Sequence, residues 1–199
     1  MDKSEVLKVF PEIDLIGDEN LKDVVIKSYM IGSELGEWDK KGGFANCPVA
    51  AQGLMRDGCD VTGIWHMRTV AQTADRVLKC LGPWFAKMGY EPDYDFCVGG
   101  ALLHDVGKLI EFDRDSEGRP CYSSIGKMFC HTSAGAYIVK QAGGSDEMVH
   151  MVLTHSYQEA PEGYGAFEKP EHVIVKGCDG ACFEQILVAW AMPGKELKI

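Results

Sequence analysis

The stretch Leu102-Leu103-His104-Asp105-Val106-Gly107-Lys108 places ionisable side chains inside an apolar run. A charged group enters a protein core only when it is paired or binds a metal ion. If residues 95–109 form a helix, His104 and Asp105 point about 100° apart, so both could reach one cation. Lys108 then lies near the same face and could contact an anion held by that cation. A core histidine beside a helix-capping aspartate is the alternative interpretation of the stretch alone.

The composition of the 199-residue chain is that of a globular protein, with 46% hydrophobic and 25% charged residues. A chain of this length buries roughly 70% of its unfolded surface, which predicts a single domain over residues 1–199. The formal net charge of −10 argues against unspecific binding to nucleic acid or to acidic membranes. We therefore expect neither nucleic acid nor membrane as a partner.

The cysteines and the first residues of the chain indicate in which cellular compartment the protein is expected. None of the eight cysteines forms a CxxC pair, which argues against a zinc knuckle. The first residues are charged and lack the apolar core of a signal peptide, and no apolar run approaches the roughly 20 residues of a membrane span. The sequence therefore predicts reduced thiols in a cytoplasmic protein.

Apolar residues at helical spacing predict an all-α fold, because strand signals are weak throughout. A short helix or arm is expected over residues 4–16. The longer predicted helices cover residues 19–35, 63–81, 94–109, 131–142, 146–155 and 171–192. Gly82-Pro83 and Pro193-Gly194 are the expected ends of two of them. Residues 113–120 predict a solvated turn or small hairpin, and residues 157–170 predict a loop.

The glycine-rich stretch 36–63 predicts a long irregular segment. Loops of this length inside compact domains are usually functional or mobile. We therefore divide the domain into residues 1–60, with an N-terminal helix and a lid, and residues 61–192, a metal-binding helical core. The lid would carry Trp38, Phe44 and Arg56. A surface loop without a function is the alternative.

Six candidate metal ligands each fall on a predicted helix or helix end. They are His66, His104, Asp105, His131, His155 and Asp179. Apart from the adjacent His-Asp pair, successive members are separated by about one helix and its connection. Separate helices can thus each contribute one inward-facing ligand to a bundle core. Imidazole and carboxylate together suit iron, manganese, nickel or zinc better than calcium.

This pattern resembles the HD-domain superfamily of metal-dependent enzymes over roughly residues 60–185. The matching text is Trp65-His66, Ala101-Leu102-Leu103-His104-Asp105-Val106-Gly107-Lys108, His131-Thr132-Ser133-Ala134-Gly135, Thr154-His155-Ser156 and Asp179. The resemblance implies a helical bundle with the metal site in its core. It also implies two divalent cations, with iron or manganese foremost and nickel, zinc or cobalt as alternatives.

The resemblance also implies how the ligands divide, because the two histidines after the HD pair are typical of the dinuclear branch. One metal would be held by His66, His104, Asp105 and Asp179. Asp105 would bridge to a second metal that is also held by His131 and His155. The alternative is a mononuclear site in which His131 and His155 only line the pocket.

A dinuclear site of this kind predicts a phosphohydrolase. Two cations sharing a carboxylate provide hydroxide near neutral pH and clamp a phosphoryl oxygen. The expected reaction is hydrolysis of a phosphate mono- or diester in a nucleotide-like or small phosphorylated metabolite. We expect Asp105 and Lys108 to be catalytic, and Lys108, Arg68 and Lys127 to bind the substrate. The expected partner is therefore a small phosphorylated molecule, and the oligomeric state is not predicted.

Two further functions are compatible with the ligand series. Some HD proteins with this ligand order are similar to inositol oxygenase and the organophosphonate oxygenases, which implies a di-iron oxygenase acting on a small polyol or organophosphonate. A sensor or structural domain with a vestigial site is the third hypothesis, against which the intact series argues.

Several other residues are not assigned to the site. His150 and His172 are expected in solvent. The aromatic residues expected in the core are Trp84, Phe85, Phe96 and Phe129. Trp38 and Trp65 are the aromatic residues of most interest for the site, because one lies in the predicted lid and the other is next to His66.

Overall fold

The computed structural model describes residues 1–51, 61–156 and 169–182. There the chain forms a helical bundle with one small hairpin, which confirms the predicted all-α class. The α-helices are α1 (Lys3–Val9), α2 (Glu19–Leu35), α3 (Gly63–Lys87), α4 (Tyr94–Leu103), α5 (Lys108–Glu111), α6 (His131–Gln141), α7 (Asp146–Thr154) and α8 (Pro170–Cys182). The 3-10 helices are η1 (Pro11–Leu15), η2 (Trp38–Lys41) and η3 (Phe44–Asn46). Strands β1 (Phe112–Arg114) and β2 (Pro120–Tyr122) pair antiparallel. Of the two structures expected for residues 113–120, a turn or a small hairpin, the chain therefore forms the hairpin.

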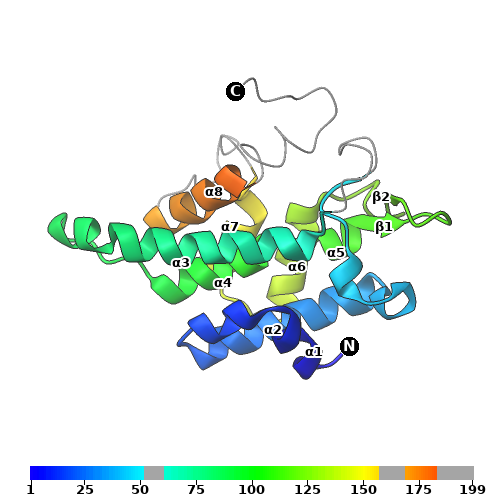
Figure 1. The fold of residues 1–199 in the computed structure, drawn as a ribbon, viewed down its shortest axis with the longest axis horizontal. Helices are drawn as coiled ribbons and strands as arrows, with labels where there is room; N and C mark the ends of the chain where they lie inside the picture. Colours follow the sequence, from blue (N-terminus) through cyan, green and yellow to red (C-terminus); the bar gives the residue numbers. More distant parts are fainter. Residues whose placement is uncertain (52–60, 157–168, 183–199) are drawn as a thin grey trace, which may run out of the picture.

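Helix α3 crosses the molecule, with α4 and α2 on one side and α8 on the other (Figure 1). Helix α4 is buried from Cys97 to Leu103 and packs against α3, α8, α2 and α7. Because apolar residues surround α4 on every side, any polar group at its end must find partners inside the core. In the described ranges, no helix is both long and apolar enough to cross a membrane.

Four helices begin directly after a residue whose side chain caps the helix N-terminus. Asp18, Thr62, Asp93 and Ser145 each accept a hydrogen bond from a backbone N–H of the first turn that follows. Such caps satisfy donors that have no partner within the helix. The starts of α2, α3, α4 and α7 therefore lie within a residue of the predicted ones.

Helix α3 continues through Pro83 to Lys87, so the predicted end at Gly82-Pro83 is wrong. Proline removes one helical hydrogen bond, which is why the sequence favoured a stop. Phe85 packs against the core cluster and against the ring of Tyr90, and this burial extends the helix. Trp84, by contrast, is 58% exposed and does not belong to the core as expected.

The helix predicted over residues 94–109 is interrupted: α4 ends at Leu103, a turn follows, and α5 begins at Lys108. The cause lies at Gly107, whose backbone packs directly against the start of α6. A Cβ atom on Gly107 would lie 1.9 Å from the carbonyl oxygen of His131 and 2.4 Å from the nitrogen of Gly135. Only glycine permits this approach, which turns Asp105 toward α6.

The described part of the predicted lid is packed into the core. Trp38 is fully buried, and its Nε1 donates a hydrogen bond to the carbonyl oxygen of Leu109 at 2.8 Å. Phe44 is also buried and packs against Phe10 and Tyr29. Part of the segment 36–51 therefore packs in the core, where Trp38 contacts α5. Arg56, most of the loop predicted over 157–170 and the last part of the helix predicted over 171–192 lie outside the described residues.

Besides Trp84, two of the residues not assigned to the site differ from expectation. His172 is buried rather than solvated, and its ring stacks on Phe96 with ring centroids 5.8 Å apart. Phe129, which was expected in the core, is 57% exposed. Phe85 and Phe96 are partly buried against the core as expected. Hydrophobicity alone therefore misplaces residues near helix ends, where packing partners come from distant segments.

Candidate metal centre

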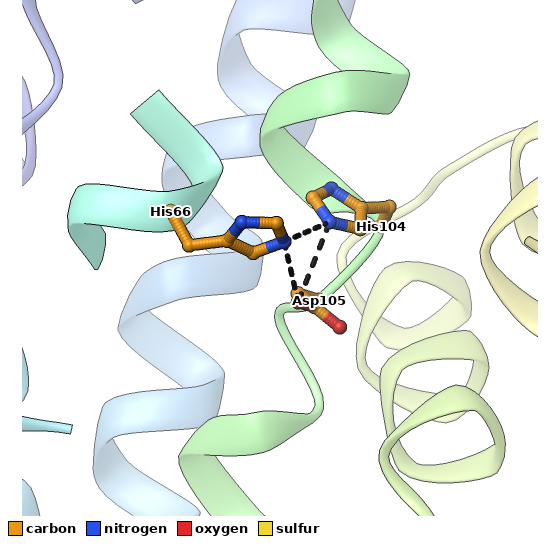
Figure 2. A group of neighbouring side chains, drawn as sticks. All are labelled: His66, His104 and Asp105. Atoms are coloured by element: carbon orange, nitrogen blue, oxygen red, sulfur yellow. Dashed lines mark hydrogen bonds and ion pairs between the residues drawn. The ribbon is translucent and has the colours of Figure 1, made fainter. Parts of the chain in front are cut away.

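Three side chains from two helix ends form the first part of the site (Figure 2). His66 lies in the first turn of α3, His104 caps the end of α4, and Asp105 follows in the turn. The two Nε2 atoms lie 3.2 Å apart. Asp105 Oδ2 lies 3.3 Å from Nε2 of His66 and 3.4 Å from Nε2 of His104. All three residues are buried.

Asp179 from α8 completes this group. Its Oδ1 lies 3.0 Å from Nε2 of His66 and 3.5 Å from Nε2 of His104. Helix α8 packs against both α3 and α4, and this packing brings a residue from near the end of the chain to the two histidines. Two carboxylates and two imidazoles thus converge from three helices and one turn.

The second oxygen of Asp105 faces a different pair of histidines. Oδ1 lies 3.3 Å from Nε2 of His131, the first residue of α6, and 3.5 Å from Nε2 of His155, which caps α7. The hydroxyl of Ser156 lies between these rings, 2.9 Å from Nε2 of His155 and 3.2 Å from Nε2 of His131. The structure therefore brings all six predicted ligands together, with Asp105 between the two groups.

The remaining ring nitrogens of three of these histidines bind acceptors outside the cluster. Nδ1 of His104 is paired with the carbonyl oxygen of Ala101 and Nδ1 of His155 with that of Val152, each at 2.7 Å. Nδ1 of His131 is paired with Oε2 of Glu111 at 3.0 Å. Such pairs fix the tautomer, with the proton on Nδ1, and aim Nε2 at a shared centre.

Sequence reasoning missed Glu111. The sequence does mark this residue, because Glu111 is a charged residue inside the apolar run Leu109-Ile110-Glu111-Phe112. The same kind of signal drew attention to His104 and Asp105. It is buried and belongs to the short helix α5. Its partner His131 is 20 residues away in the sequence, so no local spacing connects the two.

The buried carboxylates of the cluster are held charged by their neighbours. Burial raises the pKa of Asp105, but Lys108 and His104 outweigh it, and the pKa lies well below its ordinary value. Lys108 contributes directly, with Nζ 2.7 Å from Oδ2 of Asp105. Burial lowers the pKa of His104, but the charges of Asp105 and Asp179 raise it to about 10. The pKa of His155 is lowered, chiefly by burial.

The donor set fits divalent metal ions. Three overlapping groups of His and Asp atoms have all their ligand atoms within 4.8 Å of one another. Imidazole nitrogen with carboxylate oxygen is the ligand combination of iron, manganese and zinc sites. Buried carboxylates also require positive charge close by, and Nζ of Lys108 lies 2.7 Å from Oδ2 of Asp105.

The three predicted substrate-binding residues occupy different surroundings. Lys108 is buried and contacts the cluster through Asp105. Arg68 is engaged by the buried carboxylate of Glu12, with Nε 3.1 and 3.0 Å from its two oxygens. Lys127 is exposed in the segment between β2 and α6. The structure thus places only Lys108 in direct contact with a predicted ligand among the contacts described.

Glu111→Gln is expected to weaken metal binding at the His131 side of the cluster roughly tenfold, because a neutral amide orients and polarises the imidazole less than a carboxylate. Titration of the metal-free protein with Mn²⁺ measures the affinity. Glu117→Gln is the matched control, since Glu117 is a largely exposed glutamate in the hairpin turn. Equal Mn²⁺ affinities for Glu111→Gln and the control would contradict the role of Glu111.

Comparison with known proteins gives two findings. The sequence model of the HD domain matches residues 64–181, which is more than half of the chain and includes all six predicted ligands. Proteins named Ribonuclease Y are similar over a shorter stretch. That of Fervidobacterium nodosum is 39% identical over 80 residues, which is 40% of this chain and 12% of the relative. That of Pseudothermotoga lettingae is 32% identical over 87 residues, 44% of this chain and 13% of the relative. No solved structure matches the chain significantly.

These relatives contradict one expectation. Their name denotes an enzyme that acts on RNA, whereas the sequence predicted a small phosphorylated molecule and excluded nucleic acid. The exclusion rested on the net charge of −10, which describes the whole chain. Catalytic contact with one phosphodiester depends on the charges within the site, so the overall charge was the wrong guide. The oxygenase alternative finds no support in these matches.

Proposed function

Since this chain belongs to the HD-domain family of metal-dependent phosphohydrolases, we propose that it hydrolyses phosphodiester bonds in RNA. Membership of the family supports a metal-dependent hydrolase activity. The relatives named as ribonucleases favour a phosphodiester of RNA as the substrate over a phosphomonoester. The chain matches only about an eighth of the length of those relatives, so RNA as substrate is the proposed part. The observation that carries the proposal is the position of Asp105, with one carboxylate oxygen toward each group of ligands.

We propose two metal ions, because the two oxygens of Asp105 face separate pairs of histidines. Oδ2 faces His66 and His104, and Oδ1 faces His131 and His155. Asp179 contacts only the first pair among the contacts described. The ligands of the first metal would be His66, His104, Asp105 and Asp179, and those of the second Asp105, His131 and His155. Iron or manganese is the proposed metal.

The side chains of the cluster have separate tasks in this reaction. When bound, divalent metals supply hydroxide at neutral pH and offset the charge that develops on a phosphoryl group. Backbone carbonyls hold His104 and His155 in place, so their Nε2 atoms need no rearrangement. Lys108 holds a positive charge against Asp105 inside the core and would stabilise a non-bridging phosphate oxygen. The predicted roles of Arg68 and Lys127 in substrate binding stay proposals.

Metal removal tests the proposed function. The protein is purified anaerobically, loaded with Fe²⁺ or Mn²⁺, and offered a labelled single-stranded RNA, a DNA of the same sequence and a phosphomonoester. We expect cleavage of the RNA, its loss after chelation and its recovery when metal is restored. Chelation should also lower the stability by about 2.7 kcal/mol for each metal ion removed, relative to metal at 100 times its dissociation constant.

The outcomes separate the alternatives. Release of phosphate from the monoester with intact RNA would replace the proposed phosphodiesterase by a phosphatase. Cleavage of RNA at the same rate before and after chelation would show that the activity does not come from this cluster. Thermal unfolding with and without metal checks that a loss of activity does not reflect unfolding.

A further inference from the structure

A pocket of about 450 Å³ adjoins the cluster, and the roles proposed for the six predicted ligands and Lys108 do not involve it. It lies between α5, the hairpin and the segment that leads to α6. The lining includes Glu111, Tyr122, Lys127, Met128 and Phe129. Glu111 belongs to both features, because its carboxylate binds Nδ1 of His131 while the same residue lines the pocket. The pocket therefore borders a residue that binds one of the predicted ligands.

The pocket exposes large apolar side chains. Tyr122 is 41%, Met128 70% and Phe129 57% exposed. Phe129 also lines an adjoining apolar groove with Tyr137 and Leu35, both of which are largely exposed. Contiguous exposed apolar residues mark binding surfaces more often than they mark ordinary solvent-facing surface. The surface is therefore a candidate contact for a planar, partly apolar ligand group.

The segment that carries these side chains is attached to α5. The backbone N–H of Ser123 donates to the carbonyl oxygen of Glu111 at 2.9 Å, and its hydroxyl donates to that of Ile110 at 2.6 Å. Gly126 packs so closely that a Cβ atom would lie 1.9 Å from the carbonyl oxygen of Glu111. These contacts fix the backbone of the segment against α5, which carries Glu111 of the candidate site, as a subsite requires.

We propose that this pocket is a base-binding subsite for single-stranded RNA. The base of a nucleotide next to the cleaved phosphodiester stacks on Phe129 or Tyr122, and Lys127 contacts the phosphate on its far side. This inference rests on the proposed function, since it needs a phosphodiester at the cluster. Every base has an aromatic face, so stacking of this kind holds RNA without requiring one sequence. The pocket volume also falls in the range of small-ligand sites.

The double variant Tyr122→Ala with Phe129→Ala tests the subsite. We expect KM for a single-stranded RNA to rise about tenfold with kcat within about twofold, because stacking holds the substrate without touching the cleaved bond. For an RNA that carries abasic residues beside the cleaved linkage, wild type and variant should have equal KM. Phe129→Trp should keep KM low, since it preserves the stacking surface.

Trp84→Ala is the matched control, because Trp84 is as exposed as Phe129. It lies about 27 Å along α3 from His66, at 1.5 Å per residue, and should leave KM unchanged. Circular dichroism and Mn²⁺ binding confirm that each variant is folded. If wild type cleaves RNA and the double variant has the same KM, the subsite is wrong and the proposed function stands.

If wild type cleaves no RNA, the proposed function fails, and the subsite with it. An unchanged KM together with a changed oligomeric state in light scattering would assign the surface to contacts between protein molecules and overturn the subsite. A rise in KM that is equally large for the abasic RNA would also overturn it, because the lost contact would not involve a base.

Discussion

Asp105→Asn is expected to lower kcat/KM for RNA cleavage by at least about 10³-fold, the largest effect of any single change in the cluster. Both carboxylate oxygens of Asp105 face imidazoles, at 3.3 to 3.5 Å. An amide carries no charge and replaces one oxygen by a donor, so one of the two groups loses its ligand. The protein should then bind at least one metal ion fewer. Metal analysis of the purified variant and RNA cleavage assays measure both effects.

The matched control for this change is Asp23→Asn. Asp23 is an exposed aspartate that pairs with Lys3 at 3.3 Å, and surface pairs of this kind contribute little to stability. Both variants should keep a helical circular dichroism spectrum. Full activity of Asp105→Asn at an unchanged metal content would contradict the proposed site as a whole, since no other carboxylate forms ion pairs with histidines of both groups within the described contacts.

The six predicted ligands could be selected from the sequence by their order, their spacing and the resemblance to the HD-domain family. A histidine or aspartate in an apolar helix is costly unless it has a partner, and His104 and Asp105 carry that signal most clearly. The spacing predicted that separate helices contribute to one site in the bundle core, but it did not predict which helices pack together. Asp179 reaches His66 because α8 packs against α3 and α4.

The turn at residues 104–107 shows why local pattern was insufficient. Periodicity favoured one helix over residues 94–109, whereas α4 ends at Leu103. The break results from the contact between Gly107 and the start of α6, a segment more than 20 residues away. Neither the sequence around Gly107 nor that around His131 predicts the contact by itself. The same holds for Glu111, whose partner His131 becomes its neighbour only through this packing.

Hydrophobicity and net charge gave wrong predictions for features that depend on where a residue lies in the folded chain. Phe129 is apolar and was expected in the core, yet the hydrogen bonds that attach residues 123–126 to α5 leave its ring exposed. Trp38 was expected in a lid but is fully buried, and its Nε1 donates a hydrogen bond to the carbonyl oxygen of Leu109. The charge of −10 excluded nucleic acid for the chain as a whole, although the predicted site is a local feature.

Lys108→Met is expected to have the second largest effect, and it should act on both stability and activity. The side chains of Lys108 and Asp105 are almost fully buried, and Nζ lies 2.7 Å from Oδ2. Removing the lysine leaves a buried carboxylate without this partner, which costs about 3–5 kcal/mol in typical buried pairs. Denaturant unfolding of the metal-free protein measures the loss. Added Mn²⁺ should restore part of the stability, because bound cations supply the missing positive charge.

The activity of Lys108→Met separates catalysis from folding. In the metal-loaded variant, kcat for RNA cleavage should fall about 10²-fold, since a preorganised cation near the developing phosphate charge is lost. Lys3→Met, which removes an exposed lysine from the surface pair with Asp23, is the matched control and should change neither quantity measurably. A loss of stability with wild-type kcat would confine Lys108 to a structural role. Wild-type stability with a reduced kcat would instead show that the other charges of the cluster compensate Asp105 and that Lys108 acts on the substrate.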